Sequence, residues 1–169
     1  RYQYTLPYYD FSKNLTSIIS DQSINGFLNF YSTGTNKLSN TNNLRSTVVN
    51  DFNYNSNDFI SKMGFKNNFD LYFKNLNSVG KNDTIYTSNA QIDGMSILKV
   101  DSSFPLIRSK NMIKETLTPR VSFRINPGNN MDNYSSTTAN INASNVFDIN
   151  RLGLSNDFEA GRSLTFGLD

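Results

Sequence analysis

Few residues of this 169-residue chain could carry out catalysis or bind a metal. The chain has no histidine and no cysteine, which excludes Ser-His and Cys-His nucleophile pairs, disulfides and the usual zinc sites. Among the carboxylates, Asp148, Asp157 and Glu159 lie close together in sequence. A glycosidase needs two carboxylates that face one sugar across a cleft. Sequence spacing does not establish such a cleft, and we interpret these residues as solvated loop acids.

The remaining candidate sites for metals and phosphates are equally weak. Asp51 and Asp83 each follow an asparagine, but no loop of regularly spaced oxygen ligands for calcium surrounds them. The glycines form no phosphate-binding fingerprint. We therefore predict no catalytic residue, no cofactor and no metal site, and a protein that is not an enzyme.

The charge pattern argues against a nucleic-acid partner. The formal net charge is +2, and the basic residues are scattered among acidic ones. No run of lysine and arginine is present that would bind a phosphate backbone.

The composition favours half-buried β-strands. Only 37% of the residues are hydrophobic and the mean hydropathy is -0.50, yet the chain has 13 Phe and 9 Tyr. Disordered chains are poor in aromatic residues, whereas a strand with one apolar face needs an apolar residue only at every second position. No apolar run approaches the roughly 18 residues of a membrane helix.

The clearest strand signal lies at residues 64–76. Phe65, Phe69, Leu71 and Phe73 alternate with Lys66, Asp70 and Lys74, which places the two sets on opposite faces of a strand. The same reading predicts seven strands, at residues 2–11, 26–32, 44–53, 64–76, 89–102, 117–126 and 162–169. Pro7 indicates an edge, a bulge or a strand end.

We expect the chain to be one domain, residues 1–169, that starts and ends inside strands of a longer protein. One short helical turn is predicted between the last two strands, with Asn145 as its N-cap, Asp148 in its first turn and Gly153 as its stop.

Strand length bears on what the apolar face contacts. Several predicted strands reach about ten residues, whereas soluble strands average about 5–6 and tilted membrane strands need about 9–11. A transmembrane barrel gives each strand a dry outer face and a wet interior, but a two-sheet sandwich also offers two environments. Lys66, Asp70 and Lys74 on one strand, and Arg120 and Arg124 on another, need the wet side of either arrangement.

Two stretches carry a family resemblance. Residues 117–128, LTPRVSFRINPG, and 145–161, NVFDINRLGLSNDFEAG, resemble the barrel domain of the lipopolysaccharide-assembly outer-membrane protein family, LptD. The positions that match the family motif are Pro119, Arg120, Phe147, Arg151, Glu159 and Gly161. We interpret them as structural, with Arg151 and Glu159 pairing to close a loop on the barrel rim. The cysteines that join two domains in some members are missing here.

The resemblance implies an all-β fold: about seven antiparallel, up-and-down strands of a larger transmembrane β-barrel. It also implies location in the outer membrane of a Gram-negative bacterium and delivery of lipopolysaccharide to the outer leaflet. The implied partners are lipopolysaccharide, outer-membrane lipid and a plug lipoprotein similar to LptE. In such a barrel the residues expected to face the lumen are Arg45, Asp51, Lys66, Asp70, Lys74, Asp93, Lys99, Arg120 and Arg124. Their cations could attract lipid phosphates, or these residues could hydrate the lumen or pair with one another. The alternatives are another outer-membrane barrel, such as a porin or a TonB-dependent receptor, and a soluble extracellular β-sandwich that binds carbohydrate.

Overall fold

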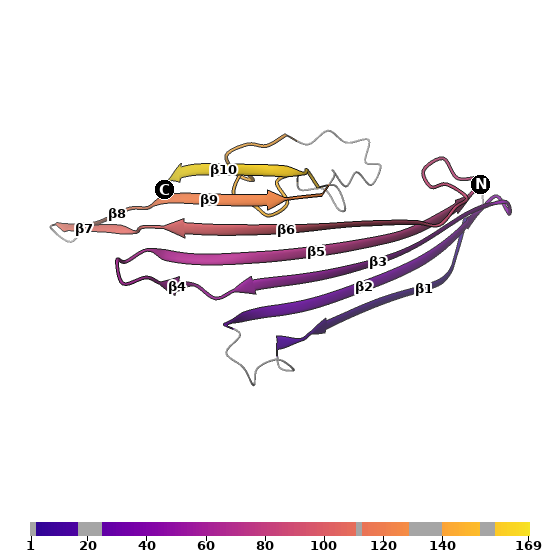
Figure 1. Ribbon diagram of the computed structural model, residues 1–169, viewed down its shortest axis with the longest axis horizontal. Helices are drawn as coiled ribbons and strands as arrows, with labels where there is room; N and C mark the ends of the chain where they lie inside the picture. Colours follow the sequence, from indigo (N-terminus) through magenta and orange to yellow (C-terminus); the bar gives the residue numbers. More distant parts are fainter. Residues whose placement is uncertain (1–2, 17–24, 111–112, 129–139, 153–157) are drawn as a thin grey trace.

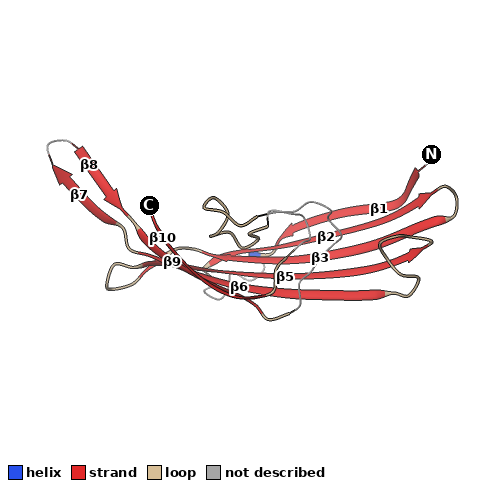
Figure 2. Cartoon of the chain, turned by 90° about the horizontal axis from the view of Figure 1, so that it is seen from above, coloured by secondary structure: helices blue, strands red, loops and turns tan. Residues whose placement is uncertain are grey.

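The computed structural model of the chain describes residues 3–16, 25–110, 113–128, 140–152 and 158–169. It is an all-β protein with 69% of its residues in strands and almost no helix. Long strands lie side by side in one twisted sheet, and a short hairpin extends from one end of it (Figures 1 and 2).

The main sheet follows the order β1-β2-β3-β5-β6-β9-β10, with β4 paired to β5 at one end. All the pairings are antiparallel. The bounds are β1 Gln3–Asn14, β2 Gly26–Ser39, β3 Asn43–Ser56, β4 Phe59–Ile60, β5 Lys66–Lys81, β6 Gln91–Ser103, β9 Pro119–Asn126 and β10 Gly161–Leu168. These long strands confirm the seven predicted ones, and most extend further than predicted.

The sheet is open. Among the described residues, β1 and β10 form its two edges and do not pair with each other, so the up-and-down strand order is present but no closed barrel is. Unpaired edges expose backbone donors and acceptors that could pair with further strands.

Proline disrupts the first strand as its position predicts. The register of β1 against β2 shifts between Thr5 and Tyr8, on either side of Pro7. A bulge of this kind moves the following side chains to the other face. Alternation along residues 2–11 alone predicts one shared face for Tyr4 and Tyr8, and this prediction is wrong. Tyr4 lies level with Leu38 and Tyr8 with Thr35, on opposite faces of the sheet.

A separate hairpin of β7 Leu106–Lys110 and β8 Ile113–Leu117 extends beyond β6 and β9. The sequence analysis predicts neither strand: it ends one strand at residue 102 and begins the next at residue 117. The prolines interrupt both strands at one level, where the Phe104 amide still donates to the Pro119 carbonyl at 2.9 Å. One long hairpin is thereby divided into two sheets.

A single helical turn is present near Asn145 but begins earlier than predicted: the Val146 amide donates to the Asn142 carbonyl at 3.0 Å. Residues 143–147 form consecutive turns and not a longer α-helix, and the capping residue is Asn142, whose Oδ1 accepts from the amide and the hydroxyl of Ser144 at 2.9 and 2.6 Å. Side chains that bond locally in this way compete with helical hydrogen bonds. The proposed stop, Gly153, lies outside the described residues.

Candidate functional site: a charged face opposite an apolar band

The charged residues predicted to share one face do so. In the register, Asp51 lies opposite Lys74, Asp70 opposite Lys99, and Lys99 opposite Arg124. Alternation along β3, β5, β6 and β9 places the remaining predicted charges on the same face. We call this the polar face, and its charged members are Arg45, Asp51, Lys66, Asp70, Lys74, Asp93, Lys99, Arg120 and Arg124.

Most cations of the polar face are bound to carboxylates. The Lys74 ammonium donates to both carboxylate oxygens of Asp51, at 2.7 and 2.9 Å. The Lys99 ammonium lies 2.5 Å from Asp101 and 3.6 Å from Asp70. Cross-strand pairs of opposite charge stabilise a sheet. Because their charges are compensated locally, these lysines are poorly placed to capture a lipid phosphate.

At the middle of the sheet the exposure of the two faces is the reverse of that in a water-soluble sheet, whereas the polar-face residues Lys66 and Asp93 near the strand ends are exposed. On the polar face Lys74 is 2% exposed and Arg124 3% exposed. On the opposite face Leu71 is 45% exposed, Phe73 46% and Phe166 73%. Lysine and arginine are almost never buried unless paired, and a large exposed apolar patch marks a contact surface.

Exposed and half-buried apolar side chains form a continuous surface across the sheet, here called the outer band. Rings lie next to each other from strand to strand: Phe30 and Phe52 have centroids 4.6 Å apart, Phe52 and Phe73 6.3 Å, and Phe11 and Phe30 6.1 Å. Such pairs add to the area that each ring covers. The members of the outer band are Tyr9, Phe11, Leu28, Phe30, Phe52, Tyr54, Phe69, Leu71, Phe73, Leu98, Val100, Val121, Phe123, Ile125, Leu164, Phe166 and Leu168.

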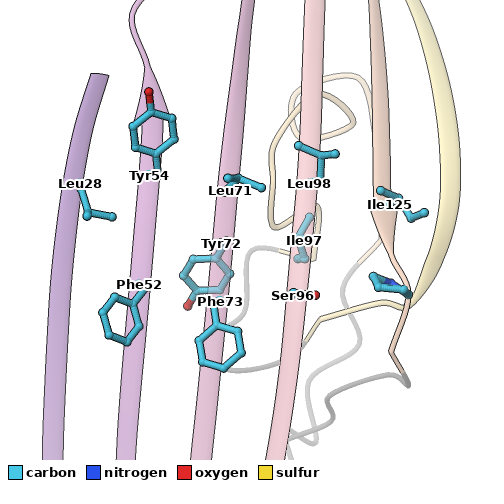
Figure 3. A pocket seen from close by; sticks show the side chains of 11 residues that line it. Leu28, Phe52, Tyr54, Leu71, Tyr72, Phe73, Ser96, Ile97, Leu98 and Ile125 are labelled. Atoms are coloured by element: carbon cyan, nitrogen blue, oxygen red, sulfur yellow. The ribbon is translucent and has the colours of Figure 1, made fainter. Parts of the chain in front are cut away.

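A groove of about 400 Å³ lies in the middle of the outer band. Figure 3 shows its lining, in which Phe52, Leu71, Phe73 and Leu98 come from three neighbouring strands, with the small side chain of Ser96 among them. The lining is almost wholly apolar, which suits hydrocarbon and offers no group for directing a polar ligand.

The outer band crosses the strands obliquely. Followed through the register, Phe11 of β1 lies level with Asn75 of β5, and Phe166 of β10 lies level with Asn67. From β1 to β10 the band therefore shifts by eight residues along the strand direction, which is about 26 Å. The six strand spacings between β1 and β10 cover about 29 Å across the sheet. The band is thus inclined by about 40° to the direction perpendicular to the strands.

A band perpendicular to the strands would include two positions that charged residues occupy, one on β1 and one on β10. Lys13 of β1 lies level with Phe73, and Arg162 of β10 lies level with Leu71. Val48 and Ile92 are exposed apolar residues level with Tyr9, and on β3 and β5 the polar residues Asn50 and Asn75 separate them from the rest of the band. The oblique course is thus marked by polar residues as well as by apolar ones.

The residues that match the family motif meet around the segment between β9 and β10. Arg151 forms an ion pair with Glu159, so the predicted pairing is confirmed. Phe147 lies under the guanidinium of Arg120, 3.6 Å from ring centre to Cζ. Pro119 begins β9 and Gly161 begins β10, the latter with a φ of 103° that favours glycine. The loop that the pair closes lies on the polar face, over β9 and β6.

Two important residues of this region were not predicted. Arg124 joins Glu159 with Nη1 3.5 Å from the carboxylate, and it also binds backbone carbonyls of the loop. Phe158 is buried against Met95 and Ile97. Arg124 was named only as a charge of the face, and no sequence signal links it to a residue 35 positions away.

At the far end of the sheet, Arg45 holds the loop after β5. Its Nε and Nη2 donate to the two carboxylate oxygens of Asp83, at 2.8 and 3.0 Å. This pairing, together with the amides of Ile85 and Tyr86 and despite the opposing effect of burial, lowers the pKa of Asp83 to about 2.

The structure offers no support for the glycosidase pair. Asp157 lies outside the described residues, and Glu159 is engaged by Arg124 and Arg151. In the described part of the chain, His, Cys, Asp and Glu do not gather in groups of three suited to a metal ion. No described helix is long and apolar enough to cross a membrane.

Comparison with known proteins leaves the family assignment open. The sequence matches no protein-family model and no curated protein. The resemblance to the lipopolysaccharide-assembly family therefore stays a prediction that rests on the two motif stretches.

Proposed function

We propose that this chain is part of a transmembrane β-barrel in the outer membrane of a Gram-negative bacterium. In this arrangement the outer band faces lipid and the polar face lines an aqueous lumen. The observation that carries the proposal is the band itself, an exposed apolar surface inclined by about 40° to the direction perpendicular to the strands. Barrel strands in membranes are tilted by about 35–45°, so a bilayer would meet the strands at this angle.

The buried charges support the same arrangement. A lumen keeps paired charges hydrated at their margins, and lipid provides an apolar medium for Phe73 and Phe166. A soluble sandwich would need a second sheet over the outer band, and would leave the polar face toward water. The burial of Lys74 and Arg124 on the polar face fits a lumen better.

We further propose that the complete protein delivers lipopolysaccharide to the outer leaflet, with an LptE-like plug lipoprotein as a partner. The support is the motif resemblance, together with the way in which its residues cooperate. Phe147, Arg151 and Glu159 belong to one folded loop between β9 and β10. The role is transport, through a hydrated interior, of a molecule with a charged head and acyl chains.

The membrane proposal is tested by fractionating cells that produce the full-length protein. The protein should stay in the outer-membrane pellet after alkaline extraction and should need detergent to dissolve. A protein that dissolves in buffer alone and gives a β-type circular dichroism spectrum would contradict the barrel and support the carbohydrate-binding sandwich.

The transport proposal is tested by depleting the same protein and measuring lipopolysaccharide at the cell surface. Surface lipopolysaccharide should fall while it accumulates in the inner membrane. If an outer-membrane location is found but surface lipopolysaccharide is unchanged, the chain belongs to another class of barrel, such as a porin or a TonB-dependent receptor.

A further inference from the structure

The geometry points to a barrier inside the proposed lumen. We propose that residues 140–152 and 158–160, called the inner loop, are clamped across the polar face by Arg124 and Phe158 and close part of the lumen until they are released. The inference rests on the proposed barrel, because without a lumen the inner loop would block nothing. The inner loop would then have a function of its own, in addition to joining β9 to β10.

The first anchor of the inner loop is polar. Arg124 of β9 donates from Nε to the Ile149 carbonyl at 2.9 Å and from Nη2 to the Glu159 carbonyl at 3.2 Å. Asn126, two residues along the same face, donates to the Glu159 carbonyl at 3.0 Å. Charge-assisted bonds of this kind are stronger than neutral ones. One buried guanidinium thus binds both described parts of the inner loop, at Ile149 and at Glu159.

The second anchor is apolar. Phe158 is 5% exposed and packs against Met95 and Ile97 of β6, with Ile149 beside this cluster. Its ring centroid lies 5.3 Å from that of Tyr72 on β5. These residues form the only hydrophobic cluster of buried residues found in the described structure. The inner loop therefore contributes a core residue to the sheet and does not merely rest on it.

The third anchor joins the inner loop to β10. The ring of Phe147 covers Gly167 so closely that a Cβ on the glycine would lie 2.6 Å from the ring, and Arg120 stacks on the same ring. A residue without a side chain is needed at this close approach. The three anchors together join the inner loop to β5, β6, β9 and β10.

The anchoring can be measured by trypsin cleavage after Arg151, whose side chain is 12% exposed and paired with Glu159. The full-length protein is purified in detergent, and folding is verified by its heat-modifiable migration in gels. Phe158→Ala removes the apolar anchor and Arg124→Met the polar one. Arg162→Met is the matched control, because Arg162 is exposed on the opposite face of β10.

Wild type and the Arg162→Met variant should resist cleavage at residue 151. Phe158→Ala should be cleaved roughly 100-fold faster or more, because losing a buried phenylalanine favours the open loop by at least that factor. Arg124→Met should also be cleaved faster. In planar bilayers, Phe158→Ala and Arg124→Met should each conduct more current than Arg162→Met.

The outcomes separate the two proposals. A barrel that folds and inserts, but in which all variants are cleaved and conduct alike, overturns the barrier and leaves the membrane proposal standing. Faster cleavage without a gain in conductance also overturns the barrier, because the inner loop would then be anchored without obstructing the lumen. A protein that needs no detergent overturns both proposals.

Discussion

Replacing Leu71 by arginine tests where the outer band lies. Leu71 is midway between Asn67 and Asn75, the polar residues that bound the band on β5. At a bilayer midplane an arginine costs about 2–4 kcal/mol in a membrane barrel, falling to about 0–1 kcal/mol near the interfaces. Leu71→Arg should therefore lower the free energy of unfolding by about 2–4 kcal/mol.

Asn77→Arg is the matched control on the same strand and face. It lies six residues from Leu71, about 20 Å along the strand and about 15 Å along the membrane normal at a tilt of about 40°. That distance exceeds half of a roughly 25 Å apolar band. Asn77→Arg should therefore change the stability by no more than about 1 kcal/mol.

The assay is guanidinium unfolding of the full-length protein in lipid vesicles, followed by circular dichroism and by the folded fraction in unheated gels. In a sheet that faces water, both substitutions are surface changes, with effects within about 0.5 kcal/mol. Equal stabilities for Leu71→Arg and Asn77→Arg would therefore refute the assignment of the outer band to lipid.

Three further perturbations test the polar residues and the loops. Asp51→Asn should destabilise the protein by about 3 kcal/mol in equilibrium unfolding, because Lys74 would be left buried without its carboxylate; adding Lys74→Met should restore much of the loss. Gly167→Ala should speed hydrogen exchange of the inner loop, because the added methyl group displaces the ring above it; unchanged exchange would contradict that anchor. Because the pKa of Asp83 is depressed, its pairing with Arg45 contributes stability above about pH 4. This stability is lost as the pH falls toward the folded pKa of about 2. Hydrogen exchange of the loop after β5 should rise over that pH range, and Asp83→Asn should abolish the pH dependence.

Strand positions and faces could be predicted from the sequence because alternation is a local property. The row of Lys66, Asp70 and Lys74 opposite Phe69, Leu71 and Phe73 needs no tertiary information. Pairing between Asp51 and Lys74, in contrast, depends on register, which the alternation alone does not determine. The bulge at Pro7 was expected, but its effect on the faces was not.

The inner loop was beyond sequence reasoning for a different reason. Its turns contain many polar residues, so its pattern indicates a solvated connection, and only the contact between Arg151 and Glu159 follows from spacing and motif. The burial of Phe158 and the bonds of Arg124 to the loop are long-range events. The same holds for the β7–β8 hairpin, where prolines mask strands that continue beyond them.

Lipid exposure of the outer band is tested most directly by spin labels at single cysteines. These 169 residues contribute no native cysteine, and any cysteine elsewhere in the full-length protein is first replaced by serine. Labels are placed along the outward face of β5, from Asn67 to Asn77, in the full-length protein in vesicles. Accessibility to oxygen, which dissolves in lipid, should peak at Leu71, while a water-soluble relaxing agent should reach the Asn67 and Asn77 positions best. Uniform access of the water-soluble agent from Phe69 to Phe73 would contradict the account.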